Sequence, residues 1–130
     1  MRRLHAAIER FDTAAPFVIA RGAKHHVDVV RVAIRDGAAT GRGEGTPIYY
    51  LGDDAARALA AVEAMREDVA AGATRADLLD LMPAGAARNA LDAALWDLEA
   101  KATGVPVWQR IGLPRPLPML TAVTVSLGEP

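Results

Sequence analysis

A chain of 130 residues with 52% hydrophobic and 24% charged residues has the length and composition of one globular domain, not of a disordered segment. Its net charge of −1 argues against a nucleic-acid or anionic-membrane partner, because both need a basic patch. The sequence has no cysteine and no run of about 18 apolar residues, which excludes disulfides, thiolate chemistry and a membrane-spanning helix. We therefore expect a cytoplasmic enzyme or enzyme domain.

The N-terminal part of the chain is predicted to form three strands. Apolar and polar residues alternate over Arg2 to Phe11 and over Val27 to Asp36. The dipeptide Asp36-Gly37 predicts a hairpin turn, with a return strand from Ala39 to Gly45. A long connection, Asp12 to Lys24, is expected between the first two strands, and long loops inside compact domains are often functional.

The remainder of the chain is predicted to be mainly helical. An irregular stretch from Gly45 to Gly52 precedes a helix over Asp53 to Gly72, which begins with two acidic residues and ends at glycine. A short helix over Thr74 to Pro83 begins with a threonine and an aspartate spaced as in a capping box. The long helix Ala86 to Lys101 is rich in alanine, so another element can approach it closely. A strand-like run, Met119 to Leu127, follows.

Two groups of residues suggest chemistry but have simpler interpretations. The segment Gly41 to Thr46 is rich in glycine but lacks the lysine and the following helix of a phosphate loop, so glycines at a bent strand end explain it better. Its Glu44 is assigned a structural role. The histidines predict no metal site, because His25 and His26 point to opposite faces of a strand and His5 is remote in sequence.

The acidic residues of the long helix are interpreted as a solvated face. Asp92 and Glu99 lie on one face but two turns apart, and Asp97 is spaced to pair with Lys101. The two tryptophans are assigned to packing. These residues therefore predict no acid–base pair.

Three residues in irregular segments are candidates for ligand contact. Arg21 lies between an apolar cluster and a glycine, where packing gives little reason for a guanidinium, and arginine can hold a carboxylate with two hydrogen bonds. Tyr49 and Tyr50 could close an apolar wall over a ligand. The sequence alone leaves both a ligand-binding and a structural role for each of the three.

Three segments together resemble a known family: Pro16 to Gly22, Gly43 to Pro47 and Ala84 to Leu98. They are similar to the front end of the L-Ala-D/L-Glu dipeptide epimerases, in the muconate-lactonizing-enzyme-like branch of the enolase superfamily. The likeness extends essentially from end to end of the chain.

The resemblance implies an α+β fold. Residues 1–116 would form a capping domain with a three-stranded antiparallel sheet plus helices. Residues 117–130 would contain the first strand of a modified (β/α)₈ barrel, Leu120 to Ser126, and the rest of the barrel would lie beyond Pro130. Alternation places Thr124 on the same strand face as Ala122 and Ser126, which is consistent with an inward position.

The resemblance also implies a substrate site. Two capping-domain loops, which match Phe17 to Lys24 and Thr46 to Leu51, would cover the barrel mouth and select the substrate. Arg21 matches the position that contacts the acidic side chain of an Ala-Glu dipeptide, and Thr124 matches a residue near the carboxylate end of the substrate.

The implied reaction is epimerisation by 1,1-proton transfer through an enolate, with two lysines and a Mg²⁺ ion held by three carboxylates. Those groups would lie beyond Pro130, so this chain is expected to contain no catalytic or metal-binding residue and to be inactive alone. A homo-oligomer is expected. The alternatives are another branch activity, such as that of a cycloisomerase or an o-succinylbenzoate synthase, and a stand-alone binding or assembly module whose last strand pairs with a partner.

Overall fold

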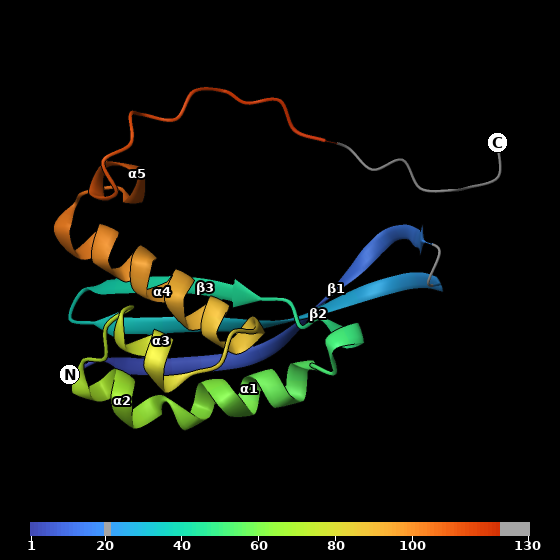
Figure 1. Ribbon diagram of the computed structural model, residues 1–130, viewed down its shortest axis with the longest axis horizontal. Helices are drawn as coiled ribbons and strands as arrows, with labels where there is room; N and C mark the ends of the chain where they lie inside the picture. Colours follow the sequence, from blue (N-terminus) through green and yellow to red (C-terminus); the bar gives the residue numbers. More distant parts are fainter. Residues whose placement is uncertain (20–21, 123–130) are drawn as a thin grey trace.

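The computed structural model describes residues 1–19 and 22–122 (Figure 1). Strands β1 (Arg3–Ile19), β2 (Gly22–Asp36) and β3 (Ala39–Gly45) form an antiparallel sheet in chain order. Gly37 turns the chain between β2 and β3 with a φ of 56°, in the left-handed region that glycine tolerates. The predicted three-stranded sheet is confirmed.

The predicted long connection over residues 12–24 is wrong, because most of it continues the strands. Pairing between β1 and β2 extends outward to Ile19 and Gly22. It is interrupted once, where β1 places residues 13–16 opposite His25 alone. This bulge contains Pro16, which has no backbone N–H to donate to a ladder. The result is a two-stranded ribbon that projects beyond β3, as Figure 1 shows.

The helices follow the sheet in sequence. They are the 3₁₀ helix η1 (Tyr49–Leu51), then α1 (Ala55–Ala64), α2 (Arg66–Ala71), α3 (Asp77–Leu81), α4 (Ala86–Thr103) and α5 (Val107–Arg110). The single helix predicted over residues 53–72 is two helices that meet at Met65, and α5 was not predicted. The predicted capping box is confirmed, since Thr74 N donates to Asp77 Oδ2 at 2.8 Å and Asp77 N donates to Thr74 Oγ1 at 3.3 Å.

Helix α4 lies directly on β3, and glycines permit this close approach. A Cβ added to Gly43 would lie 2.2 Å from the carbonyl oxygen of Ala90. Two strand residues advance about 6.7 Å and four helix residues about 6 Å, so small residues on the two elements stay nearly in step. The facing residues are Gly41, Gly43 and Gly45 on β3 and Ala94, Ala90 and Ala86 on α4. The predicted reason for the glycines, a bent strand end, is wrong; none of the three has a positive φ.

Polar side chains of α4 also protect the free edge of β3. An unpaired strand edge exposes backbone groups that can pair with another chain. Here the contacts are Asn89 Nδ2 to Glu44 O at 3.0 Å, Arg42 N to Asp97 Oδ2 at 2.7 Å, and Lys101 Nζ to Thr40 O at 3.1 Å. The predicted Asp97–Lys101 ion pair is confirmed at 2.6 Å.

The charge of Asp97 should make stability depend on pH. Burial alone would raise the pKa of Asp97, but hydrogen bonds from Lys101 and from Arg42 N outweigh it and hold the pKa below its usual value. Because the folded pKa is lowered, this contribution is present above the unfolded pKa of about 3.9 and is lost as the pH falls through the folded value.

We therefore expect Asp97→Asn to lower the free energy of unfolding at pH 7 more than at pH 3, measured by urea titration at both pH values. Asp80→Asn is the control, since the side chain of Asp80 is exposed and makes no hydrogen bond within the described residues. Equal losses at the two pH values would contradict the assignment.

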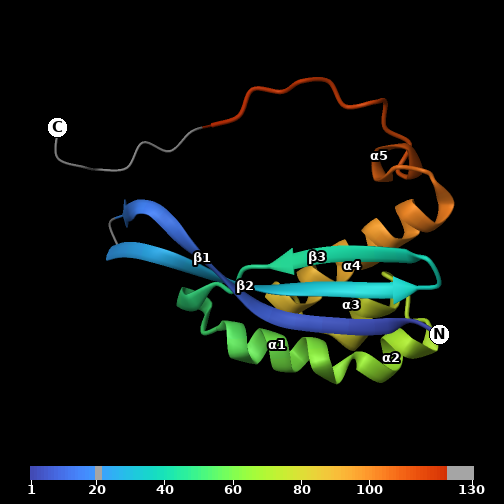
Figure 2. The same cartoon turned by 180° about the vertical axis from the view of Figure 1, so that it is seen from behind.

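The hydrophobic core lies between one face of the sheet and the helices. Each large side chain here stabilises the fold by about 1.5–3 kcal/mol. The fully buried members include Val30, Val32 and Ile34 of β2, Val62 and Val69 of α1 and α2, Leu78 of α3, and Leu91 and Leu95 of α4. The opposite face of the sheet packs against no helix of the described chain (Figure 2).

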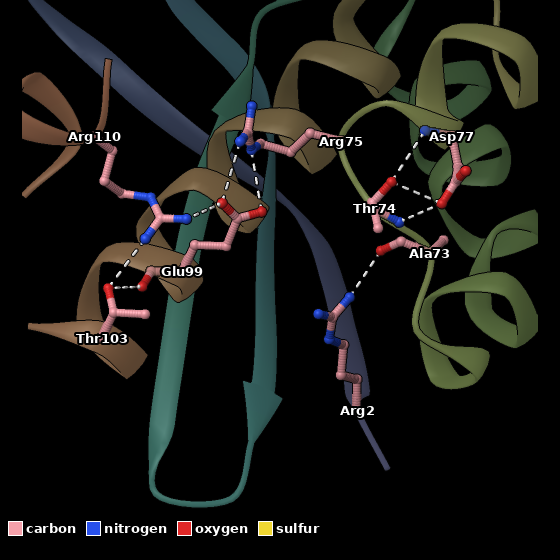
Figure 3. A network of polar contacts seen from close by, with 8 residues as sticks. All are labelled: Arg2, Ala73, Thr74, Arg75, Asp77, Glu99, Thr103 and Arg110. Carbon is pink, nitrogen blue, oxygen red and sulfur yellow. Dashed lines mark hydrogen bonds and ion pairs between the residues drawn. The ribbon is translucent and has the colours of Figure 1, made fainter. Parts of the chain in front are cut away.

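The carboxylate of Glu99 on α4 connects α5 with the segment before α3 (Figure 3). Glu99 accepts two hydrogen bonds from Arg75 at 3.1 and 3.2 Å and a third from Arg110 on α5 at 3.0 Å. The guanidinium of Arg75 also lies 3.3 Å from the ring centroid of Trp96, in a cation–π contact. These contacts hold α5 and the segment before α3 against α4.

We expect Glu99→Gln to lower the free energy of unfolding by about 1–3 kcal/mol, because two charge-assisted contacts in a half-buried site lose their carboxylate. The tryptophan emission should also change as Arg75 loosens from Trp96. Glu63→Gln is the matched control, since its ion pair with Arg66 lies on the surface and should contribute well under 1 kcal/mol. A loss no larger than that of the control would contradict this account.

Residues after α5 form no helix or strand as far as residue 122, and the side chains of Leu117, Met119 and Leu120 are exposed. The rest of the expected barrel strand, including Thr124, lies outside the described residues, so that strand stays a prediction. Within residues 1–19 and 22–122, no helix is long and apolar enough to cross a membrane.

Candidate functional site

Two segments that the sequence singled out come together at one end of the sheet. Lys24, at the start of β2, places its Nζ atom 4.9 Å from the ring centroid of Tyr49 in η1. The ring of Tyr50 meets that of Tyr49 edge to face, with centroids 5.4 Å apart. The predicted loop pair, residues 17–24 and 46–51, is therefore joined by a contact between a cation and an aromatic ring.

A mixed-charge hollow of about 390 Å³ lies beside this contact, between the base of the ribbon and the start of α1. Its lining includes Lys24, His26, Asp28, Tyr49, Asp53 and Asp54. Asp28 is already bound, because Arg10 donates to its two oxygens at 2.7 and 2.9 Å. The hydrogen bond from Arg10 lowers the pKa of Asp28, which therefore stays ionised.

Lys24 is the cation of this hollow that has no carboxylate partner within the described residues. Lys24 is an exposed residue, and its ammonium group lies over the aromatic ring of Tyr49.

A second, apolar hollow of about 510 Å³ lies on the other side of η1. Ile48 and Leu51 of the η1 segment line it together with Ala58, Met82, Pro83 and Ala87. Thr46 and Asp53 line both hollows. The η1 segment therefore contributes to both hollows, Tyr49 to the first and Leu51 to the second.

The predicted site residues have different outcomes. Tyr49 and Tyr50 are 51% and 61% exposed, and they stand at the junction of the two segments as an aromatic surface. Arg21 falls in sequence between β1 and β2, and both it and Thr124 lie outside the described residues. Lys24 was missed as a single residue. The sequence did contain an indication of its role, because Lys24 is the other cation of the segment that contains Arg21.

The described side chains offer no site for a metal ion. Within residues 1–19 and 22–122, no three His, Asp or Glu residues gather closely enough to hold one. His25 and His26 are neighbours at the base of the ribbon, and both line the mixed-charge hollow.

Comparison with known proteins gives consistent matches. Residues 3–112 match the family model described as the mandelate racemase / muconate lactonizing enzyme N-terminal domain. The L-Ala-D/L-Glu epimerase of Escherichia coli is 38% identical over the whole chain, which spans 40% of that relative's length.

Two solved structures extend the comparison. An enolase family member from Agrobacterium tumefaciens, with homology to dipeptide epimerases and with bound sodium and L-Ala-L-Glu, is 48% identical with a TM-score of 0.93; the match covers 99% of this chain and 40% of that one. A dipeptide epimerase from Methylococcus capsulatus, in complex with Mg and L-Arg-D-Lys, is 26% identical with a TM-score of 0.67; the match covers 84% of this chain and 34% of that one.

Proposed function

Because the chain belongs to the mandelate racemase / muconate lactonizing enzyme family through its N-terminal domain, we propose that it is the substrate-selecting part of an enzyme that epimerises Ala-Glu type dipeptides. The observation that carries the proposal is the meeting of the β1–β2 ribbon with η1 at Lys24 and Tyr49, beside a hollow of about 390 Å³. A lysine held at this place suits an acidic substrate side chain. The Agrobacterium tumefaciens relative, which was solved with L-Ala-L-Glu, supports the same substrate class.

The proposed roles of the residues follow from charge and position. Arg21 and Lys24 would bind the acidic side chain, since both belong to one segment and carry positive charge. Tyr49 and Tyr50 would form the aromatic wall that keeps water from the bound dipeptide. Thr124 would hydrogen-bond near the carboxylate end of the substrate. None of these residues transfers a proton in this proposal.

The chemistry requires groups that the described residues do not provide. The Methylococcus capsulatus relative was solved with Mg, which supports a divalent ion in the family. The described side chains do not fit such an ion, because no three potential ligands gather among them. We therefore place the Mg²⁺ ligands and the two proton-transferring lysines beyond residue 130, and no catalytic step is assigned to this chain.

The organisation proposed with this function is a capping domain over residues 1–116 and a first barrel strand within residues 117–130, in a cytoplasmic homo-oligomer acting on cell-wall peptides. The chain spans only 40% of the Escherichia coli relative, so a longer reading frame would supply the barrel.

The test is exchange of the α-proton of the glutamate residue in L-Ala-L-Glu, followed by NMR in D₂O with Mg²⁺. The 130-residue chain is compared with the product of the uninterrupted reading frame. We expect exchange by the longer protein alone. Exchange of an uncharged dipeptide in place of L-Ala-L-Glu would keep the reaction and change the substrate. If the longer protein exchanged neither dipeptide, another branch activity or a binding module would be favoured. Exchange by the 130-residue chain would refute the placement of the catalytic groups.

A further inference from the structure

The face of the sheet that no described helix covers carries a cluster of positive charge at one end. Figure 2 views this face, with α3 and α4 behind the strands and α1 and α2 below them. Alternation puts Val30, Val32 and Ile34 in the core, so the residues between them point outward. The pairing register then brings together Arg3, His5, Arg35 and Arg42 around the small residue Ala33. We call these four residues the basic cradle.

Two arginines of the basic cradle stand directly opposite one another. Arg3 of β1 pairs with Arg35 of β2, and like charges directly opposite across an antiparallel pair destabilise the sheet. The nearby carboxylate of Asp36 does not relieve this repulsion, since it bonds to Arg2 at 3.4 Å. Farther along the same face, Arg31 is already neutralised by Glu9 at 2.9 Å.

The guanidinium groups of the opposed pair are available to a ligand. Arg35 donates Nε to the carbonyl of Gly37 in the β2–β3 turn at 3.2 Å, which fixes the side chain and leaves both Nη groups unbonded among the described residues. The side chain of Arg3 is exposed and makes no hydrogen bond or ion pair within that part of the chain. A hollow of about 360 Å³ lies between them, lined by Met1, Arg3, Arg35 and Gly37.

We propose that the basic cradle binds a phosphate-type oxyanion between Arg3 and Arg35. A phosphate group carries up to two charges and several acceptor oxygens, so it can accept hydrogen bonds from two guanidinium forks at once. A carboxylate has one charge and two oxygens and would neutralise only one arginine. Nucleic acid is a poor fit, because the patch spans a few residues of a chain with a net charge of −1.

Inorganic phosphate and methyl phosphate are the probes, titrated into the ¹⁵N-labelled full chain at constant ionic strength made up with NaCl. We expect saturable shifts of the backbone amide signals of Arg3, Ala33 and Arg35. Tighter binding of methyl phosphate would support a phosphate ester as the natural source, and tighter binding of inorganic phosphate would support the free ion. Shifts that do not saturate, or that acetate reproduces equally, would overturn the proposal.

Three variants distinguish binding at the basic cradle from a general electrostatic effect of the added anion. R3Q and R35Q should each raise the dissociation constant at least about tenfold, since each removes charge-assisted hydrogen bonds to the anion. The side chain of Arg3 makes no hydrogen bond or ion pair among residues 1–19 and 22–122, so R3Q remains informative even if R35Q disturbs the turn. R115Q is the matched control, because Arg115 is also exposed and makes no ion pair with the residues that the structure describes. An unchanged dissociation constant in R3Q would overturn the site.

Discussion

Gly43→Ala should lower the free energy of unfolding by about 3 kcal/mol or more, which is a large share of the stability of a domain of this size. In an ordinary strand the same substitution stabilises by about 0.4–1 kcal/mol, because alanine has fewer unfolded conformations. Here the new Cβ would lie 2.2 Å from Ala90 O and 2.6 Å from Ala94 N. Both atoms belong to the backbone of α4, so no side-chain rotation relieves the overlap and the helix itself must move.

The measurement is urea or thermal unfolding of the purified chain, followed by circular dichroism. Glu44→Ala is the control on the same strand, since Glu44 lies on the outer face and its side chain is exposed. Displacement of α4 should also weaken the contacts at the β3 edge, so hydrogen exchange at Arg42 N should accelerate in Gly43→Ala. A variant as stable as the control would mean that α4 does not pack on β3 as described.

These glycines illustrate which parts of the fold can be read from the sequence. Alternation and hydrophobic spacing were enough for the strands and for α4, because each depends on residues close in sequence. The sequence did not reveal why position 43 must be glycine, because the residues that contact Gly43 belong to α4, about fifty residues later in the printed sequence. Only the alanines of the long helix indicated that a neighbour approaches closely.

The β1–β2 ribbon was missed for a different physical reason. Residues 13–16 of β1 contain Pro16 and break the alternation that predicts a strand, so they resemble a loop. In the fold, pairing resumes beyond the bulge at Phe17 and Lys24, because β2 supplies a continuous partner. This pairing carries Lys24 to Tyr49 of η1, and local patterns do not report contacts between such distant residues.

The position of Lys24 leads to the prediction with the largest functional effect. In the enzyme encoded by the uninterrupted reading frame, Lys24→Met should raise KM for L-Ala-L-Glu by about ten- to a hundredfold, the worth of a charge-assisted hydrogen bond. kcat should change less, because a side chain remote from the α-carbon binds the ground and transition states almost equally. Arg21→Met should act in the same direction, since we propose that both cations bind the acidic group.

The experiment tests whether the charge of Lys24 binds the charge of the substrate, so the substrates and variants are chosen to differ in charge and to be similar in size. L-Ala-L-Gln has the size of L-Ala-L-Glu without its charge, and its KM should be nearly the same in wild type and Lys24→Met. Lys24→Arg should restore most of the affinity for L-Ala-L-Glu. Tyr49→Phe keeps the ring beneath Lys24 and should have little effect, whereas Tyr49→Leu removes the cation–π contact and should raise KM moderately. If Lys24→Met instead raised KM equally for both dipeptides, Lys24 would support the fold of the ribbon and the acidic side chain would be bound elsewhere.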